Sequence, residues 1–456
     1  MKLSLEEILR QDSGKKILFL GREEFFSHEE SQSFLKRFDK VLTTRFDEDV
    51  VAVVEHHRLN PVEEDISYLA YDQKIPLYRL DEFERLMSHS IEENSVLMSL
   101  KLSSDQKRIY RLINNTHISD LLFIKLLEIY QWSEDEEDNN EDRGVVMATL
   151  RRFLNYKSSE EDLLYSSLTL RRLIGETTNP TLLKALLTFP NYRFMQKNKQ
   201  SISLREVIAA NPYIDADSIQ KMLRYRDDKI LFYLAANSSV SLALLKQLSN
   251  KNLTEINRAL SSNTTIDDEL FAKLLSEEEG VGQRLLAYQP ITVARFDMIK
   301  ERGLSAEIYA ILGENLHLDI EVSKQLLKEE NALLREQLAL NPSMSSDILT
   351  KIYEIGDETL YPMLSTNPST PTAILTDLYS NYRDDPSTLS SLSYNSSTPI
   401  YILKELFDMD SFEINKGLAS NPSLPLELLN ALKIDTRLRN ALTSNKTLTD
   451  SMTRKL

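Results

Sequence analysis

The chain of 456 residues is 41% hydrophobic and 27% charged, which is the balance of a folded protein and not of a disordered one. It contains no cysteine, which excludes disulfides, thiolate metal sites and a cysteine nucleophile and is typical of a reducing compartment. Its net charge of −16 should repel nucleic acid at long range, so nucleic acid is disfavoured as a partner unless a local basic patch binds it.

Residues 1–14 are predicted to form a short leading segment. Acidic residues stand there where a signal peptide would need an apolar run. No stretch of the chain reaches the ~18 apolar residues that a membrane-spanning helix requires. We therefore expect a cytoplasmic protein that makes no membrane contact.

Residues 15–88 are predicted to form a small α/β domain. Strands are expected at "KKILFLG" (15–21), "KVLTT" (40–44), "DVVAVVE" (49–55) and "IPLYRL" (75–80), and helices at 28–38, 63–74 and 81–88. We expect Asp81 to cap the last of these helices. The strands alternate with helices, and the nearly continuous apolar run at 49–55 is typical of a strand in a parallel sheet.

The order of these elements resembles that of a BRCT domain, with "KKILFLG", "KVLTT", "DVVAVV" and "KIPLYRLDEFERL" at its strands and last helix. The resemblance implies a protein-interaction module. A Rossmann-like nucleotide domain is the competing interpretation, although the chain has no G-x-G-x-x-G. His56 and His57 are the only histidine pair, and adjacent side chains on an extended segment point in opposite directions. We therefore predict no metal site and no cofactor.

Residues 89–114 are predicted to be a connecting helical segment, and residues 115–456 a repeat built on one asparagine per unit. That asparagine recurs, with Gln289 in the one missing slot, at Asn211, Asn237, Asn263, Asn315, Asn341, Asn367, Asn395, Asn421 and Asn445. The step is 26 residues from Asn211 to Asn367, and Asn179, Asn155 and Asn115 extend the series upstream. The acidic run 133–142 falls in a 14-residue excess after Asn115. It predicts an inserted loop near 133–146, and deletion of 133–142 should barely change stability.

The other columns of the repeat predict a pair of helices in each unit. An apolar residue stands three positions before the asparagine, and further apolar residues stand seven, eight and eleven positions after it, on one helical face. Four positions after it stands Ser, Asp or Thr as a helix N-cap, including Thr449, or a proline suited to the first helical turn. The asparagine itself is expected to be structural, because it tolerates left-handed backbone and bridges turns. A fixed period over so many copies indicates a solenoid.

One unit, "LASNPSLPLELLNAL" (418–432), resembles the repeat of the leucine-rich repeat variant family. The resemblance covers about 115–456 and implies a mostly α fold, a right-handed armadillo-like α-solenoid of ~26-residue helical repeats behind the small α/β domain. Members of that family can carry an iron–sulfur cluster in a Cys-rich front segment. This chain has no Cys, so no such cofactor is expected.

Two sets of basic residues are candidates for partner binding. The first is a basic cluster within residues 143–230, which carry a net charge of +6: Arg193, Lys197, Lys199, Arg224 and Arg226. Its first three members lie between Asn179 and Asn211, where the spacing is six residues longer than the usual step of 26. Insertions into repeats often carry function. The second set precedes the asparagine by five or six positions: Arg205, Arg258, Arg284, Arg335, Lys416 and Arg439. Ion pairing between neighbouring units and ordinary solvated surface are the alternatives to binding.

The sequence contains none of the motifs that would indicate catalysis, such as H-E-x-x-H, G-x-S-x-G or a P-loop. We therefore expect a non-enzymatic scaffold or adaptor that binds a protein partner through the solenoid surface and the BRCT-like domain. The alternative is a nucleic-acid-associated protein that uses the basic cluster. An enzyme on a HEAT-like scaffold would need an acid–base pair that the sequence does not place. The sequence leaves the oligomeric state undecided.

Overall fold

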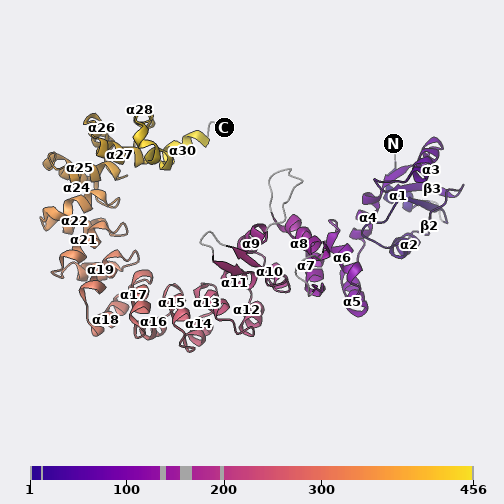
Figure 1. Cartoon of the computed structure of the whole chain (residues 1–456), viewed down its shortest axis with the longest axis horizontal. Coiled ribbons are helices and arrows are strands. Elements are labelled where there is room, and N and C mark those ends of the chain that lie inside the picture. Colours follow the sequence, from indigo (N-terminus) through magenta and orange to yellow (C-terminus); the bar gives the residue numbers. More distant parts are fainter. Residues whose placement is uncertain (1–2, 12–13, 134–139, 155–166, 196–199, 454–456) are drawn as a thin grey trace. The chain divides into compact units, whose positions relative to one another are not determined.

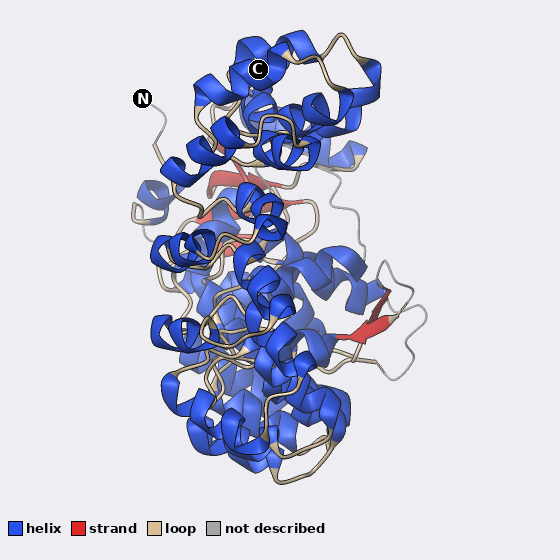
Figure 2. Cartoon of the chain, turned by 90° about the vertical axis from the view of Figure 1, so that its left-hand side faces the viewer, coloured by secondary structure: helices blue, strands red, loops and turns tan. Residues whose placement is uncertain are grey.

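The structure is a computed structural model that describes residues 3–11, 14–133, 140–154, 167–195 and 200–453 (Figure 1). The chain divides into two compact units, Met1–Leu234 and Ala235–Leu456. Helices dominate the described residues, whose strands form one four-stranded sheet and one two-stranded hairpin (Figure 2). The predicted class, mostly α with a small sheet at the front, is confirmed. Among these residues no helix is long and apolar enough to cross a membrane.

The front of the first unit is a parallel sheet of order β2-β1-β3-β4. Its elements are α1 (Leu5–Leu9), β1 (Lys16–Leu20), α2 (His28–Lys36), β2 (Val41–Thr43), β3 (Val50–Glu55), α3 (Pro61–Asp72), β4 (Leu77–Arg79) and α4 (Leu80–His89). The strands and helices predicted for 15–88 are confirmed. Helix α1 was not anticipated, and its buried leucines, Leu5 and Leu9, give the leading segment an apolar anchor.

Asp81 does not cap α4, which corrects the prediction. The helix begins at Leu80, so Asp81 already lies in its first turn. The N-cap is Arg79, the last residue of β4, and it makes no capping hydrogen bond with its side chain. Because the strand runs directly into the helix, no loop residue is left to serve as a cap. The Asp81 carboxylate instead accepts a hydrogen bond from Arg79 Nε at 3.0 Å.

The rest of the first unit consists of paired helices and one hairpin. The elements are α5 (Glu93–Ser103), α6 (Gln106–Asn114), α7 (Asp120–Ile129), α8 (Asn140–Phe153), α9 (Ser167–Glu176), α10 (Pro180–Leu186), β5 (Arg193–Met195), β6 (Ser201–Ser203), α11 (Leu204–Ala210) and α12 (Ala216–Leu223). Helix α13 (Asp228–Ala236) crosses the boundary between the two units. The predicted helical character of 89–114 is confirmed. The antiparallel β5–β6 hairpin lies in the excess that the sequence showed between Asn179 and Asn211.

The acidic run is not a simple loop, because residues 140–146 belong to α8. Asp142 is buried, and its carboxylate accepts hydrogen bonds from the Tyr130 hydroxyl at 2.7 Å and from Ser133 N and Oγ at 3.2 and 2.7 Å. Burial, and then the hydrogen bond to Asp142, raise the pKa of Tyr130, which keeps its hydroxyl a donor. Residues 134–139 lie outside the described residues. The expectation that 133–142 could be deleted without loss is therefore wrong for Asp142.

Asp142→Ala should lower the free energy of unfolding by about 2–3 kcal/mol, because a buried hydroxyl and a backbone N–H lose a charged acceptor. Urea unfolding followed by circular dichroism measures the change. Glu128→Ala is the matched control, since Glu128 is an exposed carboxylate on the adjacent helix α7. Equal stability of the two variants would show that the Asp142 contacts contribute nothing.

The second unit is a row of consecutively packed helices, a repeat-like arrangement consistent with an α-solenoid. They are α14 (Leu242–Ser249), α15 (Thr254–Ser261), α16 (Asp268–Leu275), α17 (Glu279–Tyr288), α18 (Val293–Arg302), α19 (Ala306–Glu314), α20 (Ile320–Leu326), α21 (Ala332–Leu340), α22 (Ser346–Glu354), α23 (Tyr361–Thr366), α24 (Thr372–Asn381), α25 (Pro386–Tyr394), α26 (Ile400–Asp408), α27 (Phe412–Ser420), α28 (Leu426–Leu432), α29 (Arg439–Ser444) and α30 (Lys446–Thr453). From α15 to α29 each odd-numbered helix packs against the next odd-numbered one. These odd helices are the ones that end one or two positions before the repeat asparagine or Gln289.

The predicted apolar columns are confirmed. Every residue three positions before the asparagine or Gln289 is buried: Ile208, Leu234, Leu260, Leu286, Leu312, Leu338, Leu364, Leu392, Leu418 and Leu442. The residues expected on the second helix are buried too, as in Ile348, Leu349 and Ile352. Buried residues of successive repeats thus join in shared cores, as in the cluster that runs from Leu375 to Leu448.

The cap column is confirmed in part. Asp267, for example, accepts a hydrogen bond from Leu270 N at 2.9 Å and caps α16. The prolines Pro371, Pro399 and Pro425 are N-cap residues and not first-turn residues, because ψ near 140° places them outside the helix. Thr449 does not cap a helix, since α30 already begins at Lys446.

Candidate functional site

The repeat asparagine bridges consecutive units through its side chain. In Asn341, Nδ2 donates to the carbonyl oxygens of Gly313 and Asn315, both at 2.8 Å, and Oδ1 accepts from Ser343 N at 2.9 Å. Buried side chains repeat the two donations to the preceding unit at Asn263, Asn315, Asn367, Asn395, Asn421 and Asn445. We call this series the asparagine ladder. Its amide groups are used internally, so they are not available to a ligand.

The predicted structural role of the asparagine is confirmed, but the expected left-handed backbone is wrong. The asparagines that end α6 and the odd helices α11, α19, α21, α23, α25, α27 and α29 have φ between −64° and −77° and ψ between 112° and 127°. This extended conformation ends the helix and turns the side chain back toward the preceding unit. Asn therefore suits the position for its paired amide donors and carbonyl acceptor, and not for its tolerance of positive φ.

The register is confirmed at Gln289 and corrected upstream. Gln289 Nε2 donates to the carbonyl oxygens of Ser261 and Asn263 at 3.0 and 2.8 Å, which fills the missing slot. Asn211 Nδ2 reaches Ile174 O and Thr177 O at 2.7 and 3.0 Å, so Thr177 and not Asn179 holds the preceding ladder position. Asn179 is the N-cap of α10. Asn155 lies outside the described residues.

Sequence reasoning missed a column of small residues two positions before the ladder asparagine. It contains Ala235, Ser261, Gly313, Ala339, Ser365, Ser393 and Ala419, all buried. Several of their carbonyl oxygens accept hydrogen bonds from the ladder asparagines. Their small side chains let adjacent odd helices approach closely. At Gly313, a Cβ atom would lie 2.6 Å from Gln337 Cβ. The Ala, Ser and Gly letters in this column were the signal that could have revealed the close packing.

The described members of the basic cluster lie at the surface. Arg193, on β5, and Arg224 and Arg226, after α12, are exposed. Within the described part of the chain no carboxylate forms an ion pair with any of the three. Lys197 and Lys199 lie outside the described residues.

Arg205 connects the two segments that carry the basic cluster. Its backbone N–H donates to Asn191 Oδ1 at 3.1 Å, beside β5, and its guanidinium lies 4.2 Å from the ring centroid of Tyr225. Tyr225 stands between Arg224 and Arg226. The fold thus brings both ends of the predicted cluster to one region of the first unit.

The second basic set is largely engaged within the repeat. Arg258 pairs with Glu255 at 2.9 Å and with Glu278, of the following unit, at 3.4 Å, which is the predicted ion pairing. Arg284 instead donates to Ser262 Oγ at 2.6 Å, and its guanidinium lies over the Tyr288 ring. Members with such partners do not offer a free track to an anionic ligand.

An exposed apolar or aromatic residue ends every second odd helix of the central repeat units. Tyr288 ends α17, Leu340 ends α21 and Tyr394 ends α25, with exposed fractions of 53%, 42% and 39%. We call these three residues the odd-helix stripe. The helices between them, α19 and α23, end on the polar residues Glu314 and Thr366.

Tyrosines also connect the even helices of successive units. The Tyr379 hydroxyl on α24 donates to Glu405 Oε2 on α26 at 2.7 Å, and the Tyr353 hydroxyl on α22 donates to Asp377 on α24. Burial first, and then these hydrogen bonds to carboxylates, raise the pKa of Tyr353 and of Tyr379 to about 12. The hydroxyls therefore stay protonated donors at neutral pH. These contacts link successive repeats through their even helices.

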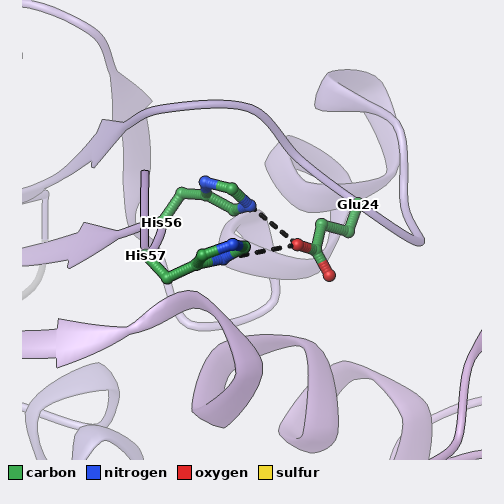
Figure 3. Close-up of side chains that lie close together, drawn as sticks. All are labelled: Glu24, His56 and His57. Carbon is green, nitrogen blue, oxygen red and sulfur yellow. Dashed lines mark hydrogen bonds and ion pairs between the residues drawn. The ribbon is translucent and has the colours of Figure 1, made fainter. Parts of the chain in front are cut away.

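His56 and His57 do not diverge, which corrects the prediction. His56 Nε2 lies 2.7 Å from Glu24 Oε1, and His57 Nδ1 lies 3.8 Å from the same oxygen (Figure 3). The ring centroids of the two histidines are 4.0 Å apart. The alternation of side chains holds only along a strand, and β3 ends at Glu55, so the pair lies in the turn that follows.

Comparison with known proteins leaves the function to be argued from this geometry. No family model, no curated protein and no solved structure matches the chain.

Proposed function

We propose that the protein is a non-enzymatic cytoplasmic scaffold that binds a protein partner along the exposed face of the odd helices in the second unit. The proposal includes a right-handed α-solenoid of the leucine-rich repeat variant type and a BRCT-like front domain that serves as a second interaction module. The odd-helix stripe is the observation that carries it. Tyrosine is enriched at interfaces because its ring supplies a large contact area and its hydroxyl a hydrogen bond.

Three other columns of the odd helices are already occupied. The residues three positions before the asparagine are buried in the core, the small residues face the neighbouring helix, and the ladder amides bond internally. The residue directly before the asparagine or Gln289 is exposed in the three helices of the stripe. In α17 this residue is Tyr288, and it lies on the same helical face as Arg284, whose guanidinium stacks on its ring. The stripe therefore gives this face apolar area to bury.

The spacing of the stripe suggests the form of the partner. Packed helices lie about 8–10 Å apart, so residues on alternate odd helices are roughly 20 Å apart. An extended chain covers that distance in about six residues at ~3.3 Å per residue. We expect an extended segment with apolar anchors about six residues apart and polar residues between them, facing Glu314 and Thr366.

The test compares two triple variants of the full chain in crosslinking affinity capture with quantitative mass spectrometry. Tyr288→Ser, Leu340→Ser and Tyr394→Ser remove the stripe. Three residues that begin even helices, with exposed fractions of 45%, 53% and 39%, give the matched control: Ile320→Ser, Ile400→Ser and Leu426→Ser. The stripe variant should lose at least about tenfold of specific capture, which corresponds to ~1.4 kcal/mol of binding. Full capture by the stripe variant, or equal loss in the control, would disprove the proposal.

The basic cluster favours a second candidate, a nucleic-acid-associated function. Exposed arginines that form no ion pair with a described carboxylate, next to an arginine stacked on Tyr225, are suited to phosphate contacts. A third arm of the same experiment carries Arg193→Glu, Arg224→Glu and Arg226→Glu. If this arm removes oligonucleotide binding that weakens steeply with salt, while the stripe variant retains it, the second candidate replaces the first.

A further inference from the structure

We propose that Glu24, His56 and His57 form a binding site for a divalent transition-metal ion, with zinc the best fit. Two imidazole nitrogens and one carboxylate oxygen are brought together from segments 32 residues apart, and these three ligand atoms all lie within 4.8 Å of one another (Figure 3). Imidazole and carboxylate are ligands that zinc commonly takes in proteins.

The three residues lie at the carboxyl end of the parallel sheet. Glu24 follows β1, and His56 and His57 follow β3, its neighbour in the sheet. From β1 the chain passes through α2 to β2 on one side, and from β3 it passes through α3 to β4 on the other. The order of the strands therefore switches between β1 and β3, which is where open α/β sheets bind their ligands. A cavity of about 420 Å³ opens there, lined by Glu24, Glu55, His56, His57, Arg79 and Asp81.

The distances suit a metal ion after small side-chain movements. Ligand atoms about 2.0–2.1 Å from a tetrahedral zinc are about 3.3 Å from one another. The observed separations of 2.7 and 3.8 Å from Glu24 Oε1 lie on either side of that value. Shifts below 1 Å would therefore equalise them.

The surroundings of His56 offer a partner to the tautomer that a metal needs. His56 Nδ1 accepts a hydrogen bond from the Arg58 N–H at 3.0 Å, and it also lies 3.1 Å from Arg58 O. When Nε2 binds a metal, the proton moves to Nδ1, which then donates to the Arg58 carbonyl. Metal-bound histidines regularly make such a second hydrogen bond to a carbonyl or carboxylate oxygen.

The loop that carries Glu24 is held in place by a buried carboxylate. The backbone N–H groups of Glu24 and Phe25 donate to Glu84 Oε1 at 3.2 and 2.8 Å, and Glu84 lies buried on α4. This anchoring fixes the loop without using the Glu24 side chain. The third ligand is therefore positioned by the fold before any metal arrives, which lowers the cost of binding.

The charges at this edge favour a cation over a phosphate. Glu55 and Asp81 add two carboxylates to the cavity wall, and Arg79 is engaged by Asp81 at 3.0 Å. The Gly21 N–H, which a nucleotide phosphate would need at the end of β1, already donates to Glu63 Oε1 at 3.2 Å. The same contacts argue against the Rossmann-like interpretation of this domain. Three protein ligands leave a fourth position of the metal open to water, on the side of the half-exposed His57.

The experiment uses the full, tag-free chain after treatment with a chelator. Isothermal titration with zinc chloride should give one site per chain, and cobalt(II) should give the intense visible absorption of a tetrahedral complex. His57→Ala and Glu24→Gln should each weaken zinc binding at least tenfold. His28→Ala is the matched control, because His28 pairs with Glu23, at 3.2 Å, outside the cluster. It should bind zinc as the wild type does.

Hydrogen exchange supplies a readout that does not depend on affinity alone. Zinc should slow exchange in residues 21–27 and 56–60 of the wild type, because the metal would join the two loops, and should not do so in Glu24→Gln. The proposal is overturned if the wild type binds no zinc, if both cluster variants bind it as well as His28→Ala does, or if the protected residues lie outside these loops.

Discussion

Leu364→Asp should lower the free energy of unfolding by about 3–5 kcal/mol, the range expected when a charge is buried without a partner. Leu364 is fully buried on α23, three positions before Asn367, and α23 packs against both α21 and α25. An aspartate there would place a carboxylate in the apolar layer shared by three units. Urea unfolding followed by circular dichroism measures the change.

Ile434→Asp is the matched control, since Ile434 is 85% exposed and the same substitution there buries no charge. Hydrogen exchange adds a second readout. Units of a repeat protein contact only their neighbours, so the loss of protection should centre on α21, α23 and α25 and fade toward α15 and α29. A Leu364→Asp variant as stable as Ile434→Asp would show that the column does not form the core.

The parts of the fold that repeat in sequence were predictable. Steps of 26 residues, followed by steps of 28, 26 and 24, align ten apolar positions such as Leu338 and Leu418, and chance would not keep them in register. Burial then follows, because helical spacing places these positions on one face and the units must cover each other. The sheet was predictable for a similar reason, since the apolar run of β3 fits only a strand covered on both faces.

The parts that depend on contacts between distant residues were not predictable. The sequence showed that an asparagine recurs once in each repeat. It did not show that the amide of one of them, Asn341, donates to two carbonyl groups of the preceding repeat. It showed an acidic run, but not that Asp142 is buried and accepts a hydrogen bond from the Tyr130 hydroxyl. Both residues are polar in the sequence. Only the contacts that they make in the folded protein decide whether such a side chain is solvated or part of the structure.

The candidate sites differ in the same way. Charge alone identified Arg193, Arg224 and Arg226, and the structure places these three at the surface. No local pattern could have joined Glu24 to His56 and His57, because the sheet brings together the ends of β1 and β3. The prediction that the two histidine side chains point in opposite directions relied on the alternation of side chains along a strand. It is wrong because both residues lie beyond the end of β3.

Substitutions at Asn395 should show how much the asparagine ladder contributes. Asn395 is buried, donates to Ser365 O and Asn367 O, both at 2.8 Å, and accepts from Ser397 N at 2.8 Å. Asn395→Ala leaves two carbonyls and one N–H without partners, and should cost roughly 3 kcal/mol or more, at ~1–3 kcal/mol for each of the three groups. Asn440→Ala, at an exposed asparagine on α29, is the control and should change stability by less than about 0.5 kcal/mol.

Asn395→Asp separates the hydrogen bonds of the ladder from its shape. Aspartate has nearly the size of asparagine, but its carboxylate would face two carbonyl oxygens and bring a charge into a buried position, so at neutral pH it should cost more than alanine does. Protonation removes the charge and restores one donor. The difference between this variant and the wild type at the same pH should therefore shrink as the pH falls, whereas the alanine variant should show no such trend. If aspartate were as stable as asparagine at neutral pH, the two carbonyl groups would not need donors. The ladder would then follow from the packing of the small-residue column and would not be what joins the units.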